Sequence, residues 1–358
     1  MSGMQNLTNL DFRRENGSVV FTPNDSVRGY VQSGAVELPP ISGKLTMTWE
    51  HVTLDNPNLG AQNAIPGLDV LSPTWFNLMD ANGGMANRAS AAYVESAHRR
   101  GYRVWGLVSN SFNAAMTTAF FKNARAMNLF MARLIIYAKL YGLDGVNIDF
   151  EGMNEADRAQ FVRFVARISE LLRPEGLTLS VDVFIPANTK SSRSHDRGEL
   201  AKYVDYVMLM AYDEHWRTSP RAGSVASMPW VTKAVEGTLA EGVPPSKLVL
   251  GVPFYMRRWE ETKANGGVKV KGYTLTMAEA EELAAKRGAQ MQWLETPGQY
   301  YFTYVANGKV QKVWVENAAS IERKLSLVGK YGLAGMAGWR KGHEKPEVWD
   351  TISSLMGK

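Results

Sequence analysis

The sequence predicts an α/β protein, a (β/α)8 (TIM) barrel with a small α+β insertion between its seventh and eighth strands. Two observations lead to this prediction. Eight short apolar segments recur along the chain, and most neighbours are separated by a stretch with the length and the three-to-four-residue apolar periodicity of an amphipathic helix. Alternation of buried strands with covering helices produces a parallel sheet, and eight such units close into a barrel.

The predicted strands follow one another along most of the chain. They cover residues 44 to 52, 67 to 76, 102 to 110, 145 to 151, 177 to 184, 206 to 213, 247 to 255 and 333 to 340. Helices are predicted between most of them, for example over residues 88 to 101 and 155 to 172. In the second helix Phe161, Phe164 and Ile168 lie on one stripe, which we expect to face the core.

One connection differs from the others. Residues 256 to 332 separate the last two strands, and this segment is much longer than one helix with its loops. Within this segment, residues 257 to 316 have the pattern of a strand, a helix and a hairpin that turns at Ala306, Asn307 and Gly308. We therefore expect a small α+β insertion subdomain here.

The domain organisation follows from these elements. We expect a barrel formed by residues 41 to 256 and 317 to 358, with the insertion at 257 to 316. Residues 1 to 40 are rich in Asn, Ser, Gly and Pro and read as a leader or linker. Without that segment and the insertion, the chain has close to the about 250 residues of a typical barrel.

Composition is that of a globular protein, since 45% of the 358 residues are hydrophobic and 21% are charged. Apolar runs fall short of the about 20 residues that cross a bilayer, so no membrane span is expected. The N-terminus, MSGMQNLTNLDFRREN, lacks the basic start and apolar stretch of a secretion signal.

Charge and cysteine content exclude further classes. The formal net charge is +5, but the 40 basic residues are scattered among 35 acidic ones, so we expect no nucleic-acid partner. The absence of Cys excludes disulfides and thiolate metal sites. We expect no metal and no cofactor, because metal-ligand spacing is missing among His51, His98, His195, His215 and His343.

The fourth predicted strand carries the chemistry. Side chains alternate faces along a strand, so Asn147, Asp149 and Glu151 share one face, while the residues between them are apolar. In a barrel this polar face points inward near the C-terminal mouth, where barrel enzymes keep their active sites. Taken alone, these acids also fit a structural pair satisfied by Arg, Lys or backbone donors.

Four motifs lie on the expected strands in order. They are Asp144-Gly145-Val146-Asn147-Ile148-Asp149-Phe150-Glu151, Met210-Ala211-Tyr212-Asp213, Gly251-Val252-Pro253-Phe254-Tyr255, and Trp339 at the end of the eighth strand. With these motifs the sequence resembles glycoside hydrolase family 18, the chitinase-like barrels. The resemblance covers roughly residues 45 to 355. Many members of that family also carry a small α+β insertion before strand eight.

Three longer stretches narrow the resemblance. Residues 72 to 78, 204 to 216 and 247 to 259 look like the branch of spore-cortex and peptidoglycan N-acetylglucosaminidases. Members of that branch often carry wall-binding LysM modules ahead of the barrel, and we expect none in residues 1 to 40. The chain is then either a catalytic fragment or a form that reaches its substrate by other means.

The resemblance implies a retaining, substrate-assisted mechanism. Glu151 would protonate the leaving oxygen, and the acetamido oxygen of the sugar would attack its own anomeric carbon. Asp149 would hold the acetamido N–H, Tyr212 would orient the acetamido carbonyl, and Trp339 would stack beneath the ring. Many members of the family have a third carboxylate at the position of Asn147. An amide cannot take up a proton there, which puts a proton relay along the strand in doubt.

The resemblance places further side chains around the substrate. Met210, Asp213 and Tyr255 are expected to bind it together with Asn147. Aromatic residues near strand ends offer either sugar-stacking platforms or core packing, namely Trp49, Trp75, Trp216 and Trp259. Trp105 is set earlier in its strand, and we expect it in the core.

Rival interpretations remain at this point. The expected partner is peptidoglycan or a chitin-like glycan, so a chitinase is the enzymatic alternative. A non-catalytic, lectin-like relative is the alternative of another class, although such relatives generally lose the acid at the position of Glu151. An unrelated barrel with accidental acids requires all four motifs to be coincidence. We expect a monomer that acts outside the cell, in association with the cell wall or the spore.

Overall fold

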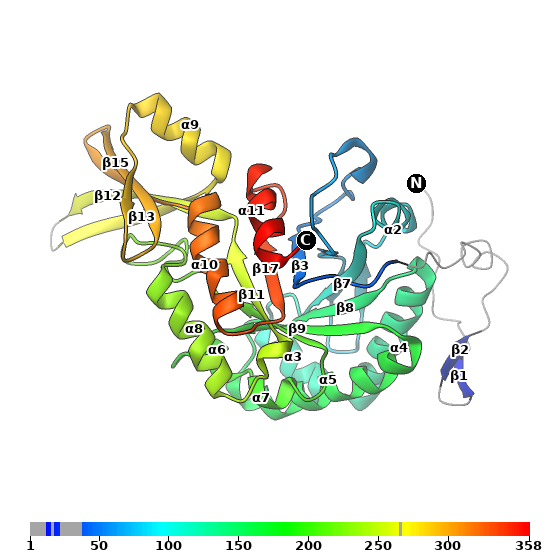
Figure 1. Ribbon diagram of the computed structural model, residues 1–358. Helices are drawn as coiled ribbons and strands as arrows, with labels where there is room; N and C mark the ends of the chain where they lie inside the picture. Colours follow the sequence, from blue (N-terminus) through cyan, green and yellow to red (C-terminus); the bar gives the residue numbers. More distant parts are fainter. Residues whose placement is uncertain (1–11, 16–17, 22–37, 265–266) are drawn as a thin grey trace.

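A closed barrel of eight parallel strands forms the centre of the protein in the computed structural model, which describes residues 12–15, 18–21, 38–264 and 267–358 (Figure 1). The strands are β3 Leu45–Glu50, β4 Val70–Pro73, β7 Arg103–Ser109, β8 Gly145–Asp149, β9 Thr178–Phe184, β10 Tyr206–Met210, β11 Leu248–Pro253 and β17 Gly335–Trp339. They pair in the order β4-β3-β17-β11-β10-β9-β8-β7, and β4 also pairs with β7. This pairing closes the sheet, and the predicted barrel is confirmed.

Helices cover the outside of the barrel. They are α2 Ala91–His98, α3 Ala114–Phe121, α4 Ala124–Tyr141, α5 Arg158–Leu172, α6 Lys190–Arg193, α7 Arg197–Leu200, α8 Met228–Ala240, α10 Ala318–Lys330 and α11 Glu347–Met356. Short 3-10 turns lie at Leu59–Ala61, Glu155–Asp157, Arg173–Glu175 and Pro245–Lys247. The predicted stripe of α5 is confirmed, because Phe161, Phe164 and Ile168 are all buried against the sheet.

The insertion begins two residues after β11 ends and forms a separate five-stranded antiparallel sheet with one helix. Its elements are β12 Tyr255–Ala264, β13 Gly267–Thr276, α9 Met277–Arg287, β14 Gln292–Leu294, β15 Gln299–Ala306 and β16 Lys309–Val315. It projects from one side of the barrel in Figure 1. Asn307 and Gly308 both have positive φ, 50° and 69°, in the two-residue turn between β15 and β16.

Two small antiparallel pairs complete the strands. β5 Phe76–Leu78 extends the barrel sheet beside β7 and pairs with β6 Met85–Asn87. β1 Phe12–Glu15 pairs with β2 Ser18–Phe21 within the predicted leader, and most of that leader lies outside the described residues. No described helix combines the length and the apolar character needed to cross a bilayer.

The bottom of β8 is fixed by the first two residues of the acidic motif. The Asp144 carboxylate accepts a hydrogen bond from Val104 N at 2.7 Å and lies 2.8 Å from His98 Nε2, which ties α2 to the barrel. A Cβ on Gly145 would lie 2.6 Å from the carbonyl oxygen of Thr178, so only glycine permits this approach of β8 to β9. Asp144 is therefore structural, far from the mouth.

The barrel interior holds a compact apolar cluster. It consists of Leu45, Met47, Trp49, Val70, Trp105, Leu107, Met208, Val249 and Ala337. Trp105 is buried in this cluster, as we expected, and stacks on Tyr206 with ring centroids 5.6 Å apart. This filling closes the barrel below the mouth, so a ligand reaches only its upper end.

A buried ion pair joins the insertion to the barrel. Glu316 follows β16, and its carboxylate accepts from Lys324 Nζ at 2.8 Å and from Ser320 Oγ at 2.7 Å, both on α10. Gln299 on β15 donates to the same carboxylate at 2.7 Å. Glu316 and Lys324 are completely buried, so neither charge can turn to water if the other is removed.

We expect Lys324→Met to destabilise the protein by about 3–5 kcal/mol, because it leaves a buried carboxylate without its cation. Urea unfolding measures this change in the free energy of unfolding. Glu316→Gln in the same chain should restore part of the loss, since the amide needs no counter-charge. The exposed Lys202→Met is a control that should change stability little. Equal stability of Lys324→Met and the wild type would contradict the assignment.

Candidate active site

A cavity of about 240 Å³ opens at the C-terminal mouth of the barrel. Its walls come from the ends of β3, β8, β9, β10 and β17, from the loops after β7, β8 and β10, and from the first residue of β12. The lining residues are Trp49, Phe112, Asp149, Glu151, Asp182, Phe184, Met210, Tyr212, Asp213, Tyr255 and Trp339. The structure therefore brings together eight of the residues that the sequence singled out, and this is the end of the barrel where enzymes of this architecture bind substrates.

Three carboxyl groups meet at the floor of the cavity. Asp149 ends β8 and Glu151 follows it, while Asp182 comes from the neighbouring strand β9. Ile148 pairs with Val181 in the parallel register, so the next residues, Asp149 and Asp182, lie side by side. Asp149 and Asp182 are buried, with 7% and 2% of their surfaces exposed.

Burial and mutual repulsion raise the pKa values of this cluster. Burial raises the pKa of Asp149 well above its ordinary value, and the charge of Asp182 raises that pKa further. Burial also raises the pKa of Glu151, with further contributions from the charge of Asp149, a hydrogen bond with its carboxyl, and Asp213. No Lys or Arg forms an ion pair with any of the three among the described residues, so no counter-charge there favours full ionisation.

Asn147 organises the cluster from below and does not line the cavity. Its Nδ2 donates to Asp182 Oδ1 at 2.8 Å and to Ser180 Oγ at 3.0 Å, and its Oδ1 accepts from Trp49 Nε1 at 2.9 Å. Because Asn147 is completely buried, it cannot touch a sugar, and its expected place in substrate binding is corrected. It holds Asp182 and Trp49 instead.

The backbone of Glu151 is held by the side chain of Asn110, just beyond β7. Asn110 Oδ1 accepts from Glu151 N at 3.0 Å, and Asn110 Nδ2 donates to Glu151 O at 2.7 Å. Asn110 is completely buried and also donates to Thr117 Oγ1. This two-way clamp fixes where the Glu151 carboxyl leaves the strand.

The opposite wall is formed by Tyr212, Asp213 and Tyr255. Asp213 Oδ1 accepts from the Tyr255 hydroxyl at 2.6 Å and from Arg257 Nη2 at 2.9 Å. Burial raises the pKa of Tyr212 well above its ordinary value, as do the surrounding acids, first Asp182. The Tyr212 hydroxyl therefore keeps its proton and remains a hydrogen-bond donor near neutral pH.

Two of the named tryptophans form one end of the cavity. Trp339 lies with its ring centroid 6.1 Å from that of Trp49, and both rings line the cavity. Trp49 is 1% exposed, so most of its ring supports Trp339 and the floor. Trp339 retains an accessible face at the mouth.

The other tryptophans do not reach the cavity. Trp75 is completely buried against Tyr93 at 5.2 Å, so it cannot stack on a sugar, and we correct that expectation. Trp259 is also completely buried and donates from its indole N–H to Gly223 O. Trp216 is 51% exposed but does not belong to the lining.

Sequence reasoning missed Asp182, Asn110 and Phe112. Phe112 is 60% exposed in the loop after β7 and lines the cavity; it and Ser111 both have φ of 54°, a conformation that a bulky side chain rarely adopts. The alternating polar positions Ser180 and Asp182 within an apolar strand were a usable signal for the third acid. No sequence pattern marks the backbone conformation of Phe112.

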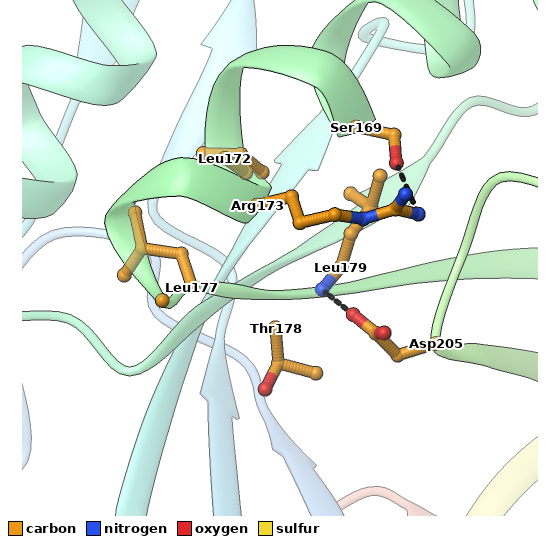
Figure 2. A pocket seen from close by; sticks show the side chains of 8 residues that line it. Ser169, Leu172, Arg173, Leu177, Thr178, Leu179 and Asp205 are labelled. Carbon is orange, nitrogen blue, oxygen red and sulfur yellow. Dashed lines mark hydrogen bonds between the residues drawn. The ribbon is translucent and has the colours of Figure 1, made fainter. Parts of the chain in front are cut away.

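A second hollow, shown in Figure 2, has a different character. It lies where α5 ends and β9 begins, so it is at the opposite end of β9 from the acids. Its polar groups serve the fold, because Asp205 Oδ2 accepts from Leu179 N at 2.8 Å. The described residues also contain no group of three or more side chains placed to hold a metal ion.

Comparisons with known proteins find relatives that are named as a glycosylase and a lytic enzyme. The chain is 28% identical over 291 residues to the uncharacterized glycosylase YvbX of Bacillus subtilis (strain 168), which covers 76% of this chain and 80% of that protein. It is 26% identical over 252 residues to the cortical fragment-lytic enzyme of Bacillus anthracis, over 69% of this chain and 57% of the relative.

A solved structure shows the same fold. The spore cortex-lytic enzyme SleL of Bacillus megaterium QM B1551 superposes with a TM-score of 0.78 at 21% identity, covering 88% of this chain and 75% of that one. Residues 105–343 match the sequence model of the family described as glycosyl hydrolases family 18. The match spans β7 to the loop after β17 and includes Asp149, Glu151, Tyr212 and Trp339. The chain therefore belongs to glycosyl hydrolases family 18 and is a glycosidase.

Proposed function

We propose that the protein is a retaining glycosidase that cleaves β-linked N-acetylglucosamine in peptidoglycan or spore-cortex fragments, with the acetamido group of the substrate as nucleophile. One observation carries this proposal. Asp149 Oδ1 is a buried acceptor without a hydrogen-bond partner, and it lies beside an acid, Glu151, whose pKa is raised. A buried acceptor of this kind is costly unless a ligand N–H satisfies it.

Glu151 supplies the proton in the first step. Its carboxyl gives the proton to the glycosidic oxygen as the bond from that oxygen to the anomeric carbon breaks. The acetamido oxygen forms a new bond to the same carbon, which produces an oxazolinium ion. Water then opens this ring from the face that the leaving group vacated, and its proton returns to Glu151, so the anomeric configuration is retained.

Asp149 and Tyr212 position the internal nucleophile from two sides. The free Oδ1 of Asp149 accepts the acetamido N–H, and its negative charge favours the positive charge that develops on the oxazolinium ion. The Tyr212 hydroxyl donates to the acetamido oxygen from the opposite wall. Alignment of a nucleophile that is already part of the substrate removes much of the entropic barrier.

The remaining lining residues hold the sugar. Trp339 stacks beneath the ring, and Met210 and Phe184 fill the space beside it. Asp213, fixed by Tyr255 and Arg257, offers its second oxygen to a sugar hydroxyl. Phe112 is exposed at the rim and offers a face to the sugar on the leaving-group side.

The mechanism limits the substrate. A sugar without a free N-acetyl group cannot assist its own cleavage, so the residue bound over Trp339 is N-acetylglucosamine or a close relative. Muramic lactam has its nitrogen tied into a ring, which favours cleavage after the glucosamine unit of cortex fragments. The names of the cortex-lytic relatives support a wall or spore substrate and a location at the cell wall or spore. We propose a monomer that needs no cofactor.

Replacement of the acid tests the proposal directly. Glu151→Gln should lower kcat by about 10²- to 10⁴-fold, because the amide cannot donate a proton to the leaving oxygen. Glu170→Gln, on the exposed face of α5, is the matched control and should leave the rate unchanged. Activity is measured on chito-oligosaccharides and on defined cortex fragments, with products identified by mass.

The stereochemistry of those products decides the mechanism. NMR of the first product should show the β-anomer, and an initial α-anomer would overturn substrate assistance. Cleavage of the chito-oligosaccharides alone would favour a chitinase. Binding of both glycans without any products would favour the lectin-like alternative.

Asp182 should set the acidic limb of the pH profile. Asp149 must be ionised to stabilise the positive charge of the oxazolinium ion, so activity falls as the pH drops through its pKa. Asp182 raises that pKa, and Asp182→Asn removes the charge while it keeps an acceptor for Asn147. The acidic limb of kcat/KM should therefore move to lower pH. Glu199→Gln, at an exposed site, is the control, and an unmoved limb in Asp182→Asn would contradict this role.

A further inference from the structure

A cavity of about 490 Å³, distinct from the hollow in Figure 2, adjoins the active site on the side of the insertion. Trp339 lines both cavities, so a sugar stacked on this ring has a neighbour in the second one. The other lining residues come from the loop after β3, from β13 and the start of α9, and from the loop after β17. They are His51, Thr274, Thr276, Glu279, Arg340 and His343.

Arg340 gives this cavity its charge. The residue directly follows Trp339, is partly buried, and forms no ion pair in the part of the chain that the structure describes. By contrast, two neighbouring basic residues are paired: Arg257 with Asp213, and Lys341, which directly follows Arg340, with Glu50. An unpaired, half-buried guanidinium is suited to a carboxylate from a ligand.

The other polar groups of the cavity are consistent with an anion. The buried Nδ1 of His343 has no hydrogen-bond partner, and burial together with Arg340 lowers the pKa of His343 to about 4. Burial, Arg340 and Arg88 also lower the pKa of His51, so both rings are neutral near neutral pH and present N–H donors. Glu279 is the acid of the described lining, and its carboxylate already accepts from Thr276 N at 2.8 Å.

We propose that this cavity is a subsite for a carboxylate carried by the sugar next to the N-acetylglucosamine on Trp339, with Arg340 as its main ligand. The inference rests on the proposed function. Peptidoglycan alternates N-acetylglucosamine with N-acetylmuramic acid, so both neighbours of a bound N-acetylglucosamine are muramyl residues. Each muramyl residue carries a lactyl ether that ends in a carboxyl group.

The same chemistry can come from two sources. In a muramyl residue without a peptide the lactyl carboxylate is free, whereas in a residue with a single L-alanine the nearest carboxylate is that of the alanine. Muramic lactam has neither, because its carboxyl group is closed onto the sugar nitrogen. Chitin has no carboxylate at any sugar. The subsite therefore favours muramyl residues that retain an acid over lactam and over chitin.

The test compares Arg340→Gln with the wild type on the tetrasaccharide of alternating N-acetylglucosamine and N-acetylmuramic acid. The neutral comparator is the same tetrasaccharide with its carboxyl groups methyl-esterified, which removes the charge and keeps the shape. In the wild type, kcat/KM should be higher for the free acid, and Arg340→Gln should reduce the acid-to-ester ratio about tenfold, as for one charge-assisted hydrogen bond. Arg340→Lys should restore part of the ratio, because it keeps the charge but loses the fork.

Controls separate this inference from the proposed function. Arg163→Gln, on the exposed face of α5, should leave the ratio at the wild-type value. A third substrate with one L-alanine on each muramyl residue, again compared with its methyl ester, tells whether the lactyl or the alanine carboxylate is bound. A drop in the acid-to-ester ratio of Arg340→Gln with either substrate supports the subsite. An unchanged ratio with both, in an enzyme that cleaves the tetrasaccharide, overturns the subsite alone. A wild type that cleaves no glycan containing N-acetylglucosamine overturns the proposed function as well.

Discussion

Repulsion among Asp149, Glu151 and Asp182 is the constraint on which the site depends. Three carboxyls share a small buried volume, and no cation pairs with them in the described part of the chain, so they cannot all ionise. The retained proton is what a general acid needs, and the remaining negative charge is what a cationic intermediate needs. The fold satisfies this constraint with neutral donors: Asn147 bonds Asp182, and Asn110 fixes the backbone of Glu151. A lysine in either place would lower the pKa of the neighbouring carboxyls and so remove the proton that the acid donates.

The barrel and the acids could be predicted because they follow from periodicity. Alternation placed Asp149 and Glu151 on one face of their strand. Once eight strands close into a barrel, that face points inward, and the end of the strand lies at the mouth. Asp182 was missed because its closeness to Asp149 depends on the stagger between β8 and β9, which no single strand reveals. The same stagger explains how this chain tolerates Asn147, since an acid on the neighbouring strand lies beside Asp149 instead.

Tryptophans were the least predictable residues, for a physical reason. A large ring near a strand end is favourable both in the core and under a sugar, and a one-residue difference in register decides between them. Trp49 and Trp339 come from inward positions of adjacent strands, whereas Trp75 follows β4 and turns outward under α2. Phe112 and Arg340 lie in loops, where backbone conformation and local partners decide what a side chain faces.

The insertion contacts the active site through the first residues of its first strand, β12. β12 starts two residues after β11, and its first and third residues, Tyr255 and Arg257, are the two groups that hold Asp213. Any rigid rotation of the insertion sheet about this junction would displace both donors together and carry Asp213 with them. A change of length beyond the distal end of the β12–β13 pairing, where Ala264 pairs with Gly267, leaves this register and both donors in place. A single-residue deletion at its base would instead turn the two donors to the other face of the strand and free the aspartate.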